Sequence, residues 1–263
     1  DGNEFRFVTD ILGGAIIGYL VDKNTYNTPD TDEYVRLGHI APKDGYYTLQ
    51  ITNQLEEVIY LDALSLVAID HPDTTEIYPN ERLLSAPPYP EFQPYPVSNL
   101  HSLSGATDQE GHDISAVLST IDDNWFADFN HTPIHGYAED HSIILELGNL
   151  QHNPHPILLG YGWVDYAHST SNWAAAQQHI SLYPPKVEVP DGAGGWTVVS
   201  TDMGSPAGLP KHMLFDLKNL FTGTDYRLRI TTNMTIYWDQ FQIGTANDIP
   251  LTVHRQPTTL SDL

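Results

Sequence analysis

Aromatic and hydrogen-bonding side chains follow an apolar run in the stretch LLGYGWVDYAHSTSNWAAAQQ, residues 158–178. An aromatic surface beside a few convergent polar groups is the usual chemistry of a small-ligand site, and sugars suit it well. The rings would stack on a sugar, and the polar groups would bond its hydroxyls. The predicted ligand-binding residues are Trp163, Asp165, Tyr166, His168, Asn172 and Trp173.

The same stretch has a second interpretation, as a polar plug that fixes the fold. Arg229 lies in an alternating apolar and polar run, and Asp165 or Asp239 would be its buried partner. A buried carboxylate must be paired or heavily hydrogen-bonded. Under this interpretation, losing either aspartate strands a buried charge at a cost of about 3–5 kcal/mol.

Five of the histidines fall within residues 131–155, where HTPIH and HNPH space them four and three residues apart. Imidazole suits copper, zinc, nickel or iron, and a nearby carboxylate can add a ligand or orient a ring. A proline inside each stretch argues against a regular helix, so polar loop histidines are the alternative. The predicted metal ligands are His131, His135, His141, His152, His155 and Asp140, with copper as the favoured metal.

Catalytic signatures are weaker than these binding signals. Glycoside hydrolysis needs two acids that face each other across a cleft, whereas neighbouring residues of a strand point to opposite faces. The adjacent acidic pairs are Glu56 and Glu57, Asp122 and Asp123, and Glu139 and Asp140. The chain contains no GxSxG, GxxxxGK[ST], HExxH or complete EF-hand loop. A calcium ion held by scattered carboxylates and carbonyls needs no such motif, and a structural calcium is compatible with this sequence.

Composition restricts the partners. The 263 residues include 34 acidic and 11 basic ones, a formal charge of −23, so nucleic acid and anionic membranes are poor partners. The absence of cysteine excludes disulfides and thiolate metal sites. No apolar stretch reaches the roughly 18 residues of a membrane-spanning helix. The start DGNEFRF lacks the features of a signal peptide, as expected of a mature exported protein or of a piece cut out of a longer chain.

The elements that must position these residues are mainly strands. From residue 141 the chain carries HSIILELG, HPILLGYGWVDY, KHMLFDL, YRLRITT and MTIYWDQFQIG, and the pair PKVEVP and GGWTVVS is typical of a hairpin. Alternation of apolar and polar residues indicates strands with one buried face. WAAAQQH is the one convincing helical turn. The pattern predicts an all-β protein, with a jelly-roll-like β-sandwich packed on an N-terminal β-region.

The predicted organisation has four parts. Residues 1–98 form an N-terminal β-region that ends in APPYPEFQPYPVS. This proline-rich stretch is expected to be an extended strap and not a strand, because proline cannot donate to a strand ladder. Residues 99–140 are an irregular connection rich in histidine and aspartate. Residues 141–250 form the jelly-roll-like sandwich, and residues 251–263 are a tail.

Several segments resemble known families. The run from 141 to 244, with DGAGGWTVV, GSPAGLPK and YRLRI, resembles galactose-binding-like jelly rolls. LVAIDHPDTTEIYPNE, GWVDYAHSTSNWAAAQ, DMGSPAGLPK and RITTNMTIYWDQ resemble the region that follows the propeller in secreted FG-GAP repeat proteins of the cartilage acidic protein (ASPIC/UnbV-associated) group. The chain departs from that group in lacking an FG-GAP calcium loop, since PDTDEY supplies only Asp30, Asp32 and Glu33. The propeller is therefore expected outside this chain.

The resemblance implies an extracytoplasmic, non-catalytic partner of a β-propeller. The function expected first is an exported binding or assembly module, periplasmic, secreted or on the cell surface. It would recognise a propeller domain, another partner protein or a glycan, with calcium as a structural aid. A histidine-based copper-binding protein is the second hypothesis, and a carbohydrate-active enzyme is the third.

Overall fold

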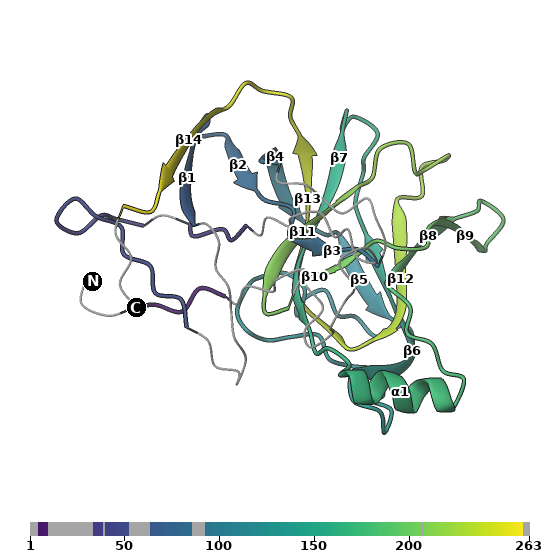
Figure 1. Ribbon diagram of the computed structural model, residues 1–263. Helices are drawn as coiled ribbons and strands as arrows, with labels where there is room; N and C mark the ends of the chain where they lie inside the picture. The colour runs from purple at the N-terminus through teal and green to yellow at the C-terminus, as the bar shows by residue number, and fades with distance from the viewer. Residues whose placement is uncertain are drawn as a thin grey trace, which may run out of the picture.

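The computed structural model describes residues 5–9, 34–38, 40–52, 64–85, 93–206 and 208–259. Within those ranges the regular structure consists of fourteen strands and one α-helix (Figure 1). The predicted all-β class is confirmed. In the predicted N-terminal β-region, residues 5–9, 34–38 and 40–52 form no strand, and residues 10–33, 53–63 and 86–92 lie outside the described residues.

The first of two large sheets contains five antiparallel strands in the order β11-β7-β13-β4-β2. Its strands are β11 (Lys211–Asp216), β7 (Pro156–Val164), β13 (Ile236–Ala246), β4 (Tyr95–Ser102) and β2 (Thr75–Tyr78).

The second large sheet contains five antiparallel strands in the order β5-β6-β12-β8-β9. Its strands are β5 (Gly105–Asp108), β6 (Tyr137–Glu146), β12 (Arg227–Met234), β8 (Lys186–Pro190) and β9 (Trp196–Ser200). The predicted hairpin is β8 and β9.

The two sheets form a sandwich because the chain crosses between them repeatedly. The connections from β6 to β7, from β11 to β12 and from β12 to β13 each join one sheet to the other, as in a jelly roll. Buried apolar side chains from both sheets form one core cluster. Leu145, Leu228 and Val187 belong to it from one sheet, and Phe241 and Ile243 from the other; all five are almost inaccessible to solvent.

Strand β7 shows why its sequence suits this position. Its residues alternate between the core and the outer face, and two of the inward positions are Gly160 and Gly162. A Cβ atom at Gly160 would lie 2.8 Å from the Phe241 ring, and one at Gly162 would lie 2.7 Å from the Trp238 ring. The glycines therefore make room for the two large rings of the neighbouring strand.

Two two-stranded sheets and one helix complete the described fold. Strand β1 (Ser65–Asp70) pairs with β14 (Thr252–Pro257), and β3 (Arg82–Leu83) pairs with β10 (Ser205–Pro206). Helix α1 (Ser169–Gln177) confirms the predicted helical turn and projects from one end of the sandwich (Figure 1). No helix of the described residues is long and apolar enough to cross a membrane.

The sandwich takes in more of the chain than the predicted residues 141–250. Strands β2 and β4 extend one sheet, and β5 forms the edge of the other. Two of these, β4 and β5, contain residues of the expected irregular connection at 99–140, and β14 lies in the expected tail. Strands are thus present within the expected connection and tail, where polar residues and a proline obscured the alternation.

Candidate functional site

Strand β7 runs from one end of the sandwich to the other. Its length is about 30 Å, at about 3.3 Å per residue. Of the predicted ligand-binding residues, Trp163 lies in β7, Asp165, Tyr166 and His168 follow that strand, and Asn172 and Trp173 lie in α1. At the opposite end lie the connections from β6 to β7 and from β11 to β12. Side chains that could bind a ligand are found at both ends.

At the α1 end, members of the two predicted sets meet. Asp165 Oδ1 lies 3.3 Å from His135 Nε2, and the His168 ring stacks on the His135 ring with centroids 4.7 Å apart. The Asp165 side chain is 37% exposed, so it is not a buried charge. The loop is held close here, because a Cβ at Gly136 would lie 2.3 Å from the Ala167 backbone nitrogen.

The ion pair predicted for Arg229 is wrong. Arg229 donates from Nε and Nη2 to the two carboxylate oxygens of Glu188, at 2.9 and 2.8 Å. The two residues are direct neighbours on β12 and β8, in the sheet that does not contain Asp239. Asp239 is fully buried, but its carboxylate accepts bonds from the backbone N–H groups of Asp122 and Asp123.

Other predicted ligand residues make internal contacts. Tyr166 donates its hydroxyl to the Pro206 carbonyl and accepts a bond from the Gly208 N–H. Asn172 accepts a hydrogen bond from the Tyr137 hydroxyl. Tyr166 and Asn172 also line a cavity of about 260 Å³, whose other lining residues are mostly apolar. Trp173 makes none of these hydrogen bonds and does not line this cavity. It lies on α1 and is 70% exposed.

Trp163 belongs to a row of rings on the outer face of the first sheet. Its ring stacks on Tyr237 with centroids 4.3 Å apart, and the Trp125 ring meets it edge-on at 6.4 Å. Tyr161 continues the row from Trp125 toward His212. The Trp163 ring therefore packs against other side chains of the protein. The sugar-binding interpretation had placed a ligand against this ring.

The five predicted metal-binding histidines do not share one set of neighbours. His131 and His141 both pack against Phe129, and burial lowers the pKa of His141. His155 lies 3.2 Å from Asp216 at the far end of the sandwich, and His152 is exposed. Burial, together with the nearby carboxylate of Asp140, the sixth predicted ligand, raises the pKa of Tyr183. The set does not come together at one point.

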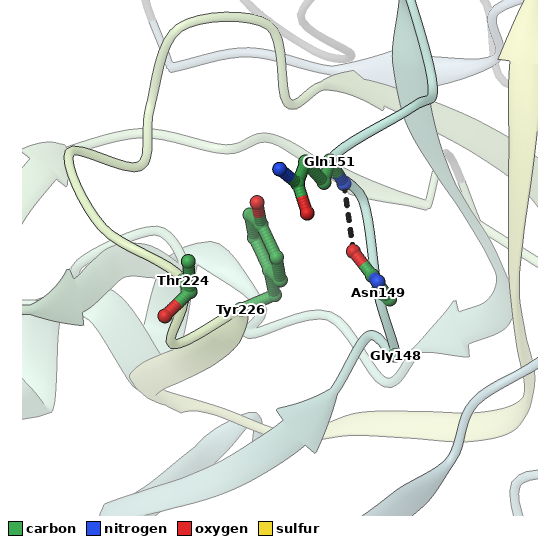
Figure 2. Close-up of a pocket in the computed structure, with 5 residues that line it drawn as sticks. All are labelled: Gly148, Asn149, Gln151, Thr224 and Tyr226. Carbon is green, nitrogen blue, oxygen red and sulfur yellow. Dashed lines mark hydrogen bonds between the residues drawn. The ribbon is translucent and has the colours of Figure 1, made fainter.

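A cavity of about 320 Å³ opens at the other end of the sandwich (Figure 2). Gly148, Asn149 and Gln151 line it from the connection between β6 and β7. Thr224 and Tyr226 line it from the connection between β11 and β12. Figure 2 shows the Tyr226 ring standing between Thr224 on one side and the two amide side chains on the other.

Hydrogen bonds and packing fix the walls of this cavity. The Asn149 side-chain oxygen accepts a bond from the Gln151 N–H at 2.9 Å, which shapes the turn. The Tyr226 carbonyl accepts a bond from the Leu147 N–H at 3.0 Å. The Tyr226 ring meets Phe221 edge-on and packs against the core cluster. The aromatic wall is thus anchored, while amide and hydroxyl groups surround it.

A group of potential metal ligands lies elsewhere, at the edge of the second sheet. One ligand atom each of Asp108, His112 and Asp128 lie within 4.8 Å of one another. It is the one such group of three or more in the part of the chain that the structure describes. None of the three is among the residues predicted from sequence. The spacing of Asp108 and His112 in DQEGH was a visible signal, but nothing in the sequence brings Asp128 to them.

Comparison with known proteins finds no matching family model, no matching curated protein and no matching solved structure. The resemblance to FG-GAP-associated and galactose-binding-like domains therefore stays a prediction.

Proposed function

We propose that the protein is a non-catalytic binding module whose ligand is a neutral sugar, held in the cavity lined by Tyr226. The observation that carries this proposal is the lining itself. One tyrosine ring, two amide side chains and one hydroxyl converge on a cavity of about 320 Å³ at an end of a rigid sandwich.

These groups match the two sides of a sugar. A pyranose presents a face of C–H groups, which packs well on an aromatic ring, and a rim of hydroxyls that both donate and accept hydrogen bonds. The amides of Asn149 and Gln151 each offer a donor and an acceptor, and the Thr224 hydroxyl offers both in one atom. A few polar groups beside an aromatic wall provide orientation and specificity.

The ligand is proposed to be small and uncharged. No acidic or basic side chain lines the cavity, and the net charge of −23 would repel an acidic sugar. Ligand cavities usually span about 300–1,000 Å³, so this one suits a single sugar unit or the end of a chain.

Binding is proposed in preference to hydrolysis. Glycosidases place two carboxyl groups on either side of the bond that they cleave. The side chains that line this cavity provide hydrogen bonds but no such pair.

The proposed setting is extracytoplasmic, with a β-propeller or another surface protein as the neighbour. The sequence pieces that resemble FG-GAP-associated proteins support this setting, and the sugar-binding proposal does not depend on it.

Glycan-array screening followed by titration calorimetry tests the proposal. We expect binding to at least one neutral glycan, and a loss of about tenfold or more in affinity for Gln151→Ala and for Thr224→Val, because each removes hydrogen bonds to the sugar. Gln177→Ala is the matched control, since Gln177 is an exposed glutamine on α1 at the other end of the sandwich. This variant should bind like the parent.

Two results would contradict the proposal. One is an array on which no neutral glycan binds. The other is a neutral glycan whose affinity is unchanged by Gln151→Ala and Thr224→Val but is lost in Trp173→Ala, which would move the site to α1.

A further inference from the structure

Asp108 is an acidic side chain directed into the sandwich. It ends β5, the edge strand of the second sheet, and is the direct neighbour of Ile143 on β6. Direct neighbours on antiparallel strands point to the same face, and Ile143 belongs to the core cluster. The Asp108 side chain is accordingly only 1% exposed. A carboxylate in this position requires a positive or hydrogen-bonding partner.

A tight turn brings His112 back to this carboxylate. The Asp108 N–H donates to the His112 carbonyl at 3.1 Å, and Gly111 within the turn has a φ of +86°. The His112 N–H donates to Asp108 Oδ1, and His112 Nδ1 lies 2.8 Å from Oδ2. The His112 side chain itself is 72% exposed, so one ring nitrogen reaches the buried oxygen from the solvent side.

A second carboxylate joins them from a separate loop. Asp128 lies sixteen residues beyond His112, yet its carboxylate oxygen comes within 4.8 Å of the ligand atoms of both other residues. Two like charges at this separation repel each other, and burial of one strengthens the repulsion. Of the three groups only His112 can carry a positive charge. A cation between them would relieve this repulsion.

We propose that Asp108, His112 and Asp128 form a binding site for a divalent transition-metal ion of the zinc type. Histidine nitrogen and carboxylate oxygen are both ordinary zinc ligands, and the exposed side leaves a fourth position for water. Calcium prefers an all-oxygen shell, so the histidine favours zinc. The site is separate from the sugar cavity and does not rest on the proposed function.

Titration calorimetry of the chelator-treated protein with zinc chloride tests the site. We expect one tight zinc per chain, and a loss of about tenfold or more in affinity for His112→Asn and for Asp128→Asn, because each removes one ligand. Both side chains are exposed, so the variants should fold, and circular dichroism checks this directly. His152→Asn, another exposed loop histidine, is the control and should bind zinc like the parent.

Cobalt gives an independent readout. Cobalt(II) substituted at the site should show visible absorption bands of a low-coordinate ion, and these should disappear in His112→Asn. The proposal is overturned if zinc does not bind, if both variants bind it like the parent, or if His152→Asn weakens binding as much as they do. Binding of calcium chloride without binding of zinc chloride would also overturn it.

Discussion

His212 illustrates how a single side chain can make the fold sensitive to acid. Its ring lies between those of Tyr78 and Tyr161, with centroids 5.1 and 4.7 Å away. Burial, together with the nearby charge of Arg36, lowers the pKa of His212 to about 4. The ring is therefore neutral in the folded protein at pH values where a histidine in the unfolded chain is already charged.

The stability of the protein should fall as the pH falls from about 6.5 to 4. Because the folded pKa lies below the ordinary value of 6.5, the unfolded chain takes up the proton first. The stability from a neutral His212 is complete above about pH 6.5, and at most about 3 kcal/mol is lost by pH 4. Urea unfolding at pH 7.5 and 4.5 measures this loss.

His212→Phe isolates the contribution of this residue. The variant keeps a ring among its aromatic neighbours but cannot take up a proton, so its stability should fall less between the two pH values. Burial lowers the pKa of His141 in the same direction, so His141 continues to titrate in both proteins. Equal losses in parent and variant would show that His212 is not responsible.

The partner of Arg229 shows which residue-level features sequence reveals. Alternation in YRLRITT correctly indicated that an arginine on this strand needs a carboxylate. Its partner depends on register, however, and β12 pairs with β8 so that Arg229 faces Glu188. No local pattern encodes which residues of two distant strands are direct neighbours. Glu188, in the segment PKVEVP, was visible as a charged residue within a strand, but 41 positions away.

At the scale of elements, segments with strong apolar periodicity were predicted correctly, whereas short polar strands were missed. The β8–β9 hairpin, β7 and α1 follow from apolar alternation and from alanines that favour helix. Strand β4 contains Pro96 and several polar residues, and β5 has only four residues. Their strand conformation depends on pairing with β13, β2 and β6, which is tertiary information. That is why both were missed.

Asp239 links a bulge in β13 to the loop that contains Asp122 and Asp123. The pairing of β13 with β7 shifts register between Trp238 and Gln240, which leaves Asp239 as the extra residue of a bulge. Its carboxylate accepts bonds from the N–H groups of Asp122 and Asp123, and Phe126 bridges to Trp238 beside it. Burial raises the pKa of Asp239, although these N–H bonds act to lower it.

Asp239→Ala should destabilise the fold by about 1–3 kcal/mol. The change leaves two N–H groups without their acceptor, and the cost of an unsatisfied buried donor sets the magnitude. The larger loss expected for a buried ion pair does not apply, because Arg229 pairs with Glu188. Guanidinium unfolding measures the change, and Asp123→Asn is the control, because in this contact Asp123 acts through its backbone and asparagine tolerates its φ of +64°. Equal losses in the two variants would contradict the assigned role.

At the scale of the whole molecule, the sandwich brings together residues that are distant in the chain. The proposed sugar cavity combines residues 148–151 with 224–226, and the proposed zinc site combines 108–112 with 128. The all-β sandwich and the strand β7 were both predicted from the sequence. The grouping of loops at each end follows from strand order, which composition and periodicity do not determine.

The charge of the molecule leads to a prediction about salt. Acidic residues outnumber basic ones by 34 to 11, so the compact state holds many like charges close together. Self-repulsion of this kind destabilises the folded state, and dissolved ions screen it over a distance that falls from about 30 Å at 0.01 M to about 10 Å at 0.1 M. Raising sodium chloride from 0.01 to 0.2 M should therefore stabilise the protein.

We expect a gain of about 1 kcal/mol, which is about 2–4 °C in Tm for a chain of this size. Differential scanning calorimetry at pH 7.5 with a metal chelator measures it without a contribution from bound ions. At pH 4.5 the carboxylates begin to be protonated, so the gain should be smaller. Salt also weakens ion pairs such as Arg229–Glu188, but only 11 basic residues are present to form them. A Tm that falls with salt at pH 7.5 would mean that these pairs outweigh the repulsion among the carboxylates.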